Sequence, residues 1–300
     1  MTTSIGEIAA LLTSACFSLS SSLFTVATRR FSAMVINRTR LVFAAVFLMF
    51  IHLIFYGRLL PLDAEPRRWF WLGISGIVGL VMGDIFLFHA YARIGARLSM
   101  LMMSLAPVLA SIVAWLFLGE ALKNLEIIGI VVTIGGIAWV VLEKNGKARE
   151  APDHRYLRGI LLGLGAATGQ ALGLILSKKG LDGGFPAISG NAIRMVTAAT
   201  TMWVLTFFQG QAKATIQQLT GAPRSIWFIL GGMFFGPVLG VSLSLFSVQN
   251  VDVGIASTLM ALPPIFLLPI GYVVFKERFG WGAVIGTILA IAGVSLILLV

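Results

Sequence analysis

Long apolar stretches alternate with short polar ones along the whole chain, and many of them are long enough to cross a membrane. A run of about 18 or more apolar residues is typical of a transmembrane helix, because lipid offers no partner for an unpaired backbone N–H or C=O group. Strand-like alternation is missing from the sequence, so we predict an all-α membrane protein. The ten predicted spans lie, to within a few residues, at 5–27, 35–56, 70–92, 99–118, 126–142, 158–177, 187–209, 226–249, 254–275 and 281–299.

The second half of the chain repeats informative positions of the first half 157 residues later. Each half holds five predicted helices, and this odd number makes the second half enter the membrane from the opposite side. Such inverted repeats are a known transporter plan. We therefore predict two repeats, at 1–145 and 158–300, joined by a polar linker at 146–157. The recurring pairs are Gly83 with Gly240, Leu105 with Leu262, Pro107 with Pro264, Glu120 with Glu277, Gly129 with Gly286 and Gly136 with Gly293.

Composition supports the membrane prediction and limits the partners. The 300 residues are 58% hydrophobic and 11% charged, whereas a soluble domain is about 25% charged. The net charge of +10 is expected in loops near anionic lipid headgroups, and no basic tail with interleaved aromatic residues indicates a nucleic-acid partner. Residues 1–7 carry no Lys or Arg, so we expect a retained first helix rather than a signal peptide. The loop charges leave the orientation of the chain in the membrane open.

Prolines inside the predicted helices are candidate hinge or gate positions. Pro107 lies near the middle of the fourth span, Pro263 and Pro264 occupy the same place in the ninth, and Pro237 lies in the eighth. A proline inside a helix removes a backbone hydrogen bond and bends the helix. Recurrence in both repeats predicts bent helices that face a central cavity. The alternative is a static kink that only fits the bundle.

Asp84 is the most informative acidic residue, because it lies deep in the third span. A charge at this depth is costly and should have a partner. We expect a paired structural acid, with Arg38 or Arg40 as its cation. His89 follows five residues later, so it does not share a helix face with Asp84, and this spacing disfavours a proton relay between the two.

Mildly polar and adaptable side chains are expected to line the solute site. Serines at three- and four-residue spacing give the first span one polar stripe, which suits an amphipathic solute with an apolar body. The alternative for each hydroxyl is a bond to a carbonyl of its own helix. The candidate substrate-binding residues are Ser18, Ser22, Asp84, His89, Tyr91, Met100, Met103, Ser104, Gln170, Ser244, Ser257 and Met260.

The sequence gives little support for an enzyme. The three histidines are scattered, and the chain has neither the H-E-x-x-H spacing of a zinc-binding helix nor a P-loop. Val81-Met82-Gly83-Asp84 approaches the intramembrane aspartyl protease pattern, but Val81 stands where the first glycine belongs. We therefore predict no catalytic residues, no metal and no cofactor.

Residues 89–141 resemble an EamA domain of the drug/metabolite transporter superfamily. The second half keeps most of the same pattern, with Lys276 where the first half has a glycine. Arg38 and Arg194 resemble the basic residue that opens the second helix of each repeat. The positions that carry the resemblance are Tyr91-Ala92, Leu98-Ser99, Pro107, Gly119-Glu120, Gly129 and Gly135-Gly136 in the first half, and Pro264, Glu277, Gly286 and Gly293 in the second.

This resemblance implies a multi-pass exporter of amino acids or other small metabolites in the bacterial inner (plasma) membrane. The interior, rich in serine, methionine and aromatic residues, is compatible with the aromatic amino acid exporters of the YddG type. Aromatic or large apolar amino acids are therefore the solutes expected first, and a ten-helix bundle is expected to work as a monomer. Other solutes, import, lipid-linked substrates and a membrane-embedded enzyme stay open as alternatives, as does proton coupling through Asp84 and His89.

Overall fold

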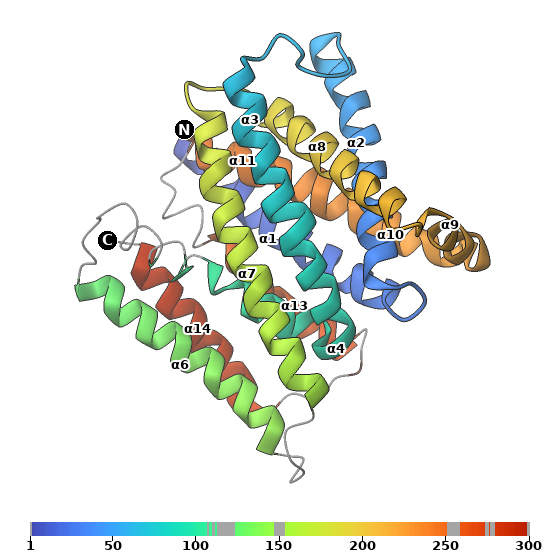
Figure 1. Cartoon of the computed structure of the whole chain (residues 1–300). Helices are drawn as coiled ribbons and strands as arrows, with labels where there is room; N and C mark the ends of the chain where they lie inside the picture. The colour runs from blue at the N-terminus through green and yellow to red at the C-terminus, as the bar shows by residue number, and fades with distance from the viewer. Residues whose placement is uncertain are drawn as a thin grey trace.

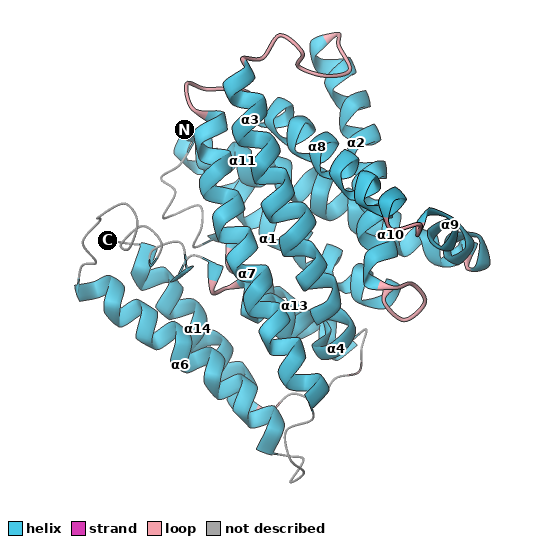
Figure 2. Ribbon diagram, viewed as in Figure 1, coloured by secondary structure: helices cyan, strands magenta, loops and turns pink. Residues whose placement is uncertain are grey.

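The computed structural model describes residues 2–106, 108–109, 112, 124–146, 154–250, 259–273, 276 and 280–298, and Pro107 and Ser257 lie outside this part of the chain. Every regular element in these ranges is a helix (Figures 1 and 2). The first half contains α1 (Thr2–Ala27), α2 (Ala33–Tyr56), α3 (Pro66–Ser75), η1 (Gly76–Gly83), α4 (Asp84–Met103) and α6 (Asn124–Gly146). The second half contains α7 (His154–Leu181), α8 (Ala187–Phe208), α9 (Ala212–Gly221), η2 (Pro223–Ser225), α10 (Ile226–Met233), η3 (Phe234–Gly240), α11 (Val241–Asn250), α13 (Pro263–Val273) and α14 (Trp281–Leu298).

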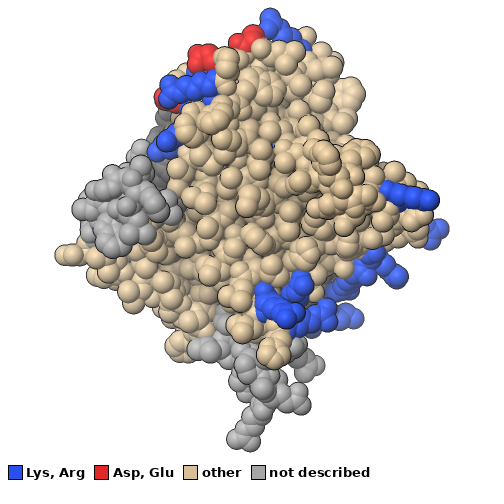
Figure 3. All heavy atoms as spheres, viewed as in Figure 1, with Lys and Arg blue, Asp and Glu red and all other residues tan. Residues whose placement is uncertain are grey.

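Within the described ranges, five helices are long and apolar enough to cross a membrane, and three further apolar helices are shorter. The all-helical membrane fold is thus confirmed, while the count of ten spans stays a prediction. Large apolar side chains such as Phe50, Ile54 and Trp227 are exposed, as expected for a surface that faces lipid. Figure 3 shows a broad uncharged face, with Lys and Arg gathered above it and along its lower right edge.

The third and fourth predicted spans are joined by a turn at Gly95. Gly95 has φ 72° and ψ 175°, a combination that is open to glycine and strained for other residues. Residues on either side of it are helical, so α4 turns back within a single residue. The turn brings Tyr91, before it, close to Met100, after it.

Both halves contain a stretch of π-helix in their third helix. These stretches are η1 and η3, and they end at Gly83 and Gly240, which are equivalent positions of the repeat. A π-helical stretch widens the turn and leaves backbone groups without their α-helical partner, and such stretches are frequent at functional sites. Pro237 lies inside η3 and has no N–H to donate.

The first helix of each half packs against the third helix of the other half. Helix α7 packs along α3, η1 and α4, while α1 packs along α10, η3 and α11 (Figure 1). The second helices α2 and α8 also pack against each other, and so do α6 and α14. This exchange of equivalent contacts is the packing expected for two repeats related by a pseudo-two-fold axis.

Close backbone approach between helices depends on glycine. A Cβ atom added to Gly169 would lie 2.7 Å from the Cα atom of Gly83, and one added to Gly173 would lie 3.0 Å from the Cα atom of Gly79. Helices in lipid associate through such small-residue contacts, because no hydrophobic force drives them together. The interface between α7 and η1 is therefore a backbone-to-backbone contact between the two halves.

Candidate functional site

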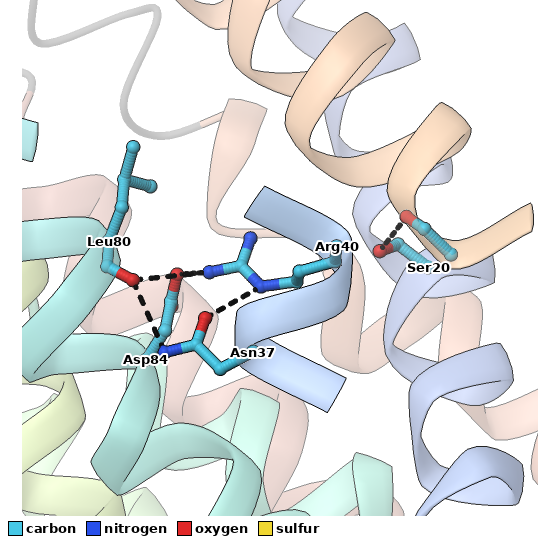
Figure 4. A network of polar contacts seen from close by, with 6 residues as sticks. Ser20, Asn37, Arg40, Leu80 and Asp84 are labelled. Carbon is cyan, nitrogen blue, oxygen red and sulfur yellow. Dashed lines mark hydrogen bonds and ion pairs between the residues drawn. The ribbon is translucent and has the colours of Figure 1, made fainter. Parts of the chain in front are cut away.

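A buried ion pair lies at the junction of η1 and α4. Asp84, 8% exposed, is the first residue of α4, and its carboxylate pairs with the guanidinium of Arg40 on α2, which is 3% exposed (Figure 4). The sequence analysis expected a cation for Asp84 and left Arg38 and Arg40 open, and the structure selects Arg40. Arg38 instead donates to Thr215 Oγ1 at 2.8 Å and to Gln211 Oε1, so it binds α9.

Arg40 and Asn37 together hold a backbone carbonyl of the π-helical stretch. Arg40 Nε donates to Asn37 Oδ1 at 3.0 Å, and Arg40 Nη2 and Asn37 Nδ2 both reach the carbonyl oxygen of Leu80, at 3.3 Å and 3.5 Å (Figure 4). The guanidinium also lies over the ring of Phe88, 5.0 Å from its centroid. The widened turn of η1 is thus stabilised from α2.

The second half contains an equivalent hydrogen bond from an asparagine to a carbonyl of its π-helical stretch. Asn191 on α8 donates from Nδ2 to the carbonyl oxygen of Pro237 at 2.9 Å, and to Ser242 Oγ at 3.0 Å. Leu80 and Pro237 are equivalent positions of the two π-helical stretches. In both halves an asparagine on the second helix therefore binds the same carbonyl on the third helix.

This equivalence corrects the alignment of the basic residues. Asn37 and Arg40 are three residues apart on α2, and Asn191 and Arg194 are three apart on α8. Arg40, not Arg38, is therefore the counterpart of Arg194. The sequence analysis missed the repeated N-x-x-R pattern, which comparing the second helices directly would have revealed.

Arg194 reaches out of its own half. It is 4% exposed, and a Cβ atom added to Gly79 in η1 would lie 3.6 Å from Arg194 Nη2 and 3.4 Å from Gln170 Oε1. The guanidinium and the Gln170 amide thus meet at the glycine surface of η1. Asp84 attracts Arg194 as well as Arg40, although Val241 takes the place of Asp84 in the second half.

An aromatic and methionine cluster adjoins the ion pair. Tyr91 donates its hydroxyl to Met100 Sδ at 3.3 Å, and Ser104 Oγ donates to the Met100 carbonyl at 3.3 Å. The Phe88 ring contacts the Tyr91 ring at 5.8 Å between centroids and links this cluster to Arg40. Met103, also predicted, packs on the same apolar cluster. The structure thus gathers these predicted residues in one cluster, which the Phe88 ring connects to the Asp84–Arg40 pair.

His89 does not join Asp84. Its Nδ1 lies 2.7 Å from the carbonyl oxygen of Ile85 on its own helix, and its own carbonyl accepts from Arg93 Nη1 at 2.9 Å. No described hydrogen bond connects His89 with Asp84, in agreement with their spacing of five residues.

The serine stripe of α1 binds the chain around the start of α13. Ser14 Oγ donates to the carbonyl of Leu259, whose α-helical partner would be the N–H that Pro263 lacks. Ser18 Oγ lies 3.2 Å from the Pro263 carbonyl and 2.7 Å from the Ser14 carbonyl, and Ser22 Oγ donates to the Ser18 carbonyl at 2.8 Å. The serine donors are therefore engaged with backbone carbonyls, both between helices and within α1.

The remaining predicted site residues are scattered. Ser244 Oγ donates to the carbonyl of Val241 on its own helix at 2.8 Å, and no hydrogen bond in the described ranges joins it to Asp84. Met260 is half-buried just before the break in the helix at residues 261–262. Among the residues that the structure describes, no three His, Cys, Asp or Glu side chains lie close enough to hold a metal ion.

Comparison with known proteins agrees with this architecture. An uncharacterized transporter of Bacillus subtilis (strain 168), YvbV, is 32% identical over 101 residues, which are 32% of this chain and 31% of that protein. The similarity to this relative thus spans about a third of its length. One crystal structure of a protein aligns over 99% of this chain and 96% of its own, with a TM-score of 0.64 and 17% identity, and this likeness shows the fold.

The match to a family covers far more of the chain than the similarity to YvbV does. The EamA-like transporter family matches twice, at residues 4–142 and at residues 157–299. The two matches cover nearly the whole chain and correspond to the two halves that interlock in the fold. The chain therefore belongs to the EamA-like transporter family of the drug/metabolite transporter superfamily.

Proposed function

We propose that this protein exports small metabolites across the bacterial inner membrane by alternating access, with aromatic or large apolar amino acids as the solutes expected first. Two inverted five-helix repeats, at 1–145 and 158–300, enclose the pathway, and the linker at 146–157 connects them. A monomer is sufficient for this arrangement, because both repeats come from one chain. The solute binds near the bilayer midplane, between the repeats.

The observation that supports this proposal is the pair of equivalent asparagine hydrogen bonds, one in each half. Asn37 and Asn191 bind equivalent carbonyls in the π-helical stretches of the two halves. A rocking motion between inverted repeats requires two equivalent positions where a helix can bend, one in each half. In this proposal η1 bends when the pathway opens to one side, and η3 bends when it opens to the other.

Prolines contribute to the same bends. Pro237 lies inside η3, and Pro263 and Pro264 begin α13 directly after a break in the helix. We assign these three residues to the hinge, together with Pro107, the counterpart of Pro264 in the first half, which lies outside the described residues. The serine donors of α1 keep the carbonyls at the second break paired while the helices move.

The solute contacts proposed first are those next to the ion pair. Tyr91, Met100, Met103 and Ser104 form a cluster that suits an aromatic or large apolar side chain. Gln170 lies across the interface and supplies an amide. Asp84 acts as a structural acid paired with Arg40, which supports facilitated export rather than proton coupling.

Reconstitution tests the proposal directly. Purified protein in proteoliposomes is expected to take up labelled aromatic or large apolar amino acids without a pH gradient, whereas liposomes without protein are not. The variants Asp84→Asn and His89→Gln are expected to keep the pH dependence of the wild type. Uptake that requires a pH gradient and loses it in either variant would assign proton coupling to that residue. No uptake of any amino acid would overturn the solute class.

A further inference from the structure

The N-x-x-R pairs of the two halves differ in one respect. In the first half Arg40 Nε donates to Asn37 Oδ1 at 3.0 Å. In the second half the equivalent atoms, Arg194 Nε and Asn191 Oδ1, are both buried, and neither has a hydrogen-bond partner among the residues that the structure describes. A buried polar atom without a partner is costly, so both atoms call for an explanation. Their equivalence to a satisfied pair shows that the side chain of Arg194 has turned away from its asparagine.

The charges around Arg194 are also unbalanced. Asp84 is the one buried carboxylate among the described residues, and it already forms an ion pair with Arg40. Arg40, Arg194 and Asp84 together leave one positive charge in excess. Arg38 is buried as well, but it binds the neutral side chains of Thr215 and Gln211 on α9 and is not counted with this group. A charge in the membrane interior is rare and marks a functional group by default.

The guanidinium of Arg194 lies where the two halves meet. It belongs to α8 of the second half, and it faces Gly79 of the first half, beside the amide of Gln170 on α7. A ligand at this guanidinium would therefore contact elements of both halves. A site on a moving interface can bind in one state and release in the other.

We propose that Arg194 binds the carboxylate of the transported solute, with Gln170 beside it as a second polar contact. This inference rests on the proposed function and names the chemical group that the pathway recognises. A guanidinium binds a carboxylate through two parallel hydrogen bonds, and the unpaired Nε is one of its donors. One excess positive charge balances a single carboxylate, whereas a phosphate dianion would leave an excess negative charge.

Access to Arg194 depends on the motion of the transporter. The side chain is buried in this structure, and the backbone of α8 at Arg194 touches the surface of η1 at Gly76, so the site is closed here. Separation of α8 from η1 exposes the guanidinium to the pathway. Amino acids and simple organic acids share the carboxylate, and the test separates these two sources.

Thermal stabilisation of the purified protein in detergent measures binding without transport. The probes are matched sets: L-phenylalanine, 3-phenylpropionate and L-phenylalaninamide, and the corresponding leucine, 4-methylpentanoate and leucinamide. We expect the carboxylates to raise the melting temperature of the wild type and the amides to leave it unchanged. A response to the amino acids alone assigns a zwitterion, and an equal response to both acids assigns any carboxylate.

Two variants of Arg194 test the residue. Arg194→Gln is expected to lower the apparent affinity for carboxylates about 10- to 100-fold, since it removes a charge-assisted hydrogen bond. Arg194→Lys keeps the charge without the planar fork and is expected to fall in between. Arg224→Gln is the control, because it removes an exposed positive charge of the same half.

A glycine variant keeps the test open if the arginine variants fail to fold. Gly79→Ala adds a Cβ atom in ordinary contact with Arg194, Gln170 and Gly173, so it narrows the site without a clash. Gly73→Ala adds the same atom at the same helix interface against Thr197, at 3.4 Å, and serves as its control. We expect Gly79→Ala to weaken carboxylate binding several-fold and Gly73→Ala to leave it unchanged.

The outcomes separate this inference from the proposed function. If no carboxylate stabilises the wild type more than its amide, or if Arg194→Gln binds carboxylates as the wild type does, the inference is wrong. Uptake into proteoliposomes without carboxylate selectivity would leave the proposed function standing and remove the inference. Selective binding of carboxylates without any uptake would keep Arg194 as an anion site and remove the transport proposal.

Discussion

The side chain of Asn191 binds the carbonyl of Pro237, 2.9 Å away, in the middle of the π-helical stretch η3. Its counterpart Asn37 reaches the carbonyl of Leu80 in η1, so the same contact occurs in both halves of the chain. A widened helical turn leaves carbonyls that need another donor, and an asparagine on a neighbouring helix supplies one. The contact therefore couples the second helix of each half to the bend in the third.

Removal of this donor is expected to destabilise the bend. Asn191→Ala leaves the buried Pro237 carbonyl without its described partner, and we expect the free energy of unfolding to fall by about 1–3 kcal/mol. Asn250→Ala is the control, because Asn250 is half-buried and its described hydrogen bond is an exposed one to the carbonyl of Phe246 on its own helix. Unfolding in mixed detergent micelles measures both variants, and equal stability of the two would contradict the role of Asn191.

The excess positive charge predicts an asymmetry between the partners of the buried ion pair. Asp84→Asn removes the carboxylate that faces the buried guanidiniums of Arg40 and Arg194, and we expect a loss of about 3–5 kcal/mol. Arg40→Met keeps the volume roughly constant and leaves Arg194 to balance Asp84, so it is expected to cost less. The same unfolding measurement compares the two losses of stability. If Arg194 does not interact with Asp84, Arg40→Met is expected to cost more than Asp84→Asn.

An exposed ion pair provides the control for that comparison. Arg58 and Asp63 lie 3.1 Å apart, with 63% and 68% of their side chains exposed. Exposed pairs contribute little to stability, because water and salt screen them. Arg58→Met and Asp63→Asn are therefore expected to behave alike and to leave the stability close to that of the wild type.

Hydrophobic length and the repeated glycines, prolines and acids were sufficient to predict the helical membrane fold and its two related halves. The sequence analysis placed a break between the third and fourth spans, but it did not predict the turn at Gly95. The helical spans follow from local sequence, because a long apolar helix is dictated by the residues themselves.

The polar site was only partly predictable. The burial of Asp84 and its pairing with a nearby arginine followed from the cost of a charge in lipid. The N-x-x-R pair was missed, because Asn37 and Asn191 are 154 residues apart whereas the third helices repeat after 157. The loop between the second and third helices absorbs this difference, as loops commonly do. The π-helical stretches depend on a donor from another helix, and no local pattern reveals such a donor.

The interhelical serine bond is expected to matter more than the bonds within α1. Ser14→Ala leaves the Leu259 carbonyl without the donor that replaces the missing N–H of Pro263, and we expect a loss of about 1–3 kcal/mol. Ser22→Ala is the matched control, since the described bond of its hydroxyl goes to the Ser18 carbonyl within its own helix. Equal losses in thermal unfolding would show that the stripe has no special role at α13.

The close contact between α6 and α14 predicts a clear effect of a single added methyl group. A Cβ atom at Gly136 would lie 2.5 Å from the backbone nitrogen of Ala290 and 2.7 Å from the carbonyl oxygen of Gly286, and neither backbone atom can turn aside as a side chain can. Gly136→Ala must therefore push the helices apart, and we expect a loss of about 1–3 kcal/mol. Among the described residues no heavy atom lies within 4 Å of a Cβ added to Gly135, so Gly135→Ala is the matched control. Because alanine is the better helix former, Gly135→Ala is expected to keep or raise the melting temperature. If Gly136→Ala melts at the same temperature as Gly135→Ala, the two helices do not pack as closely as this structure places them.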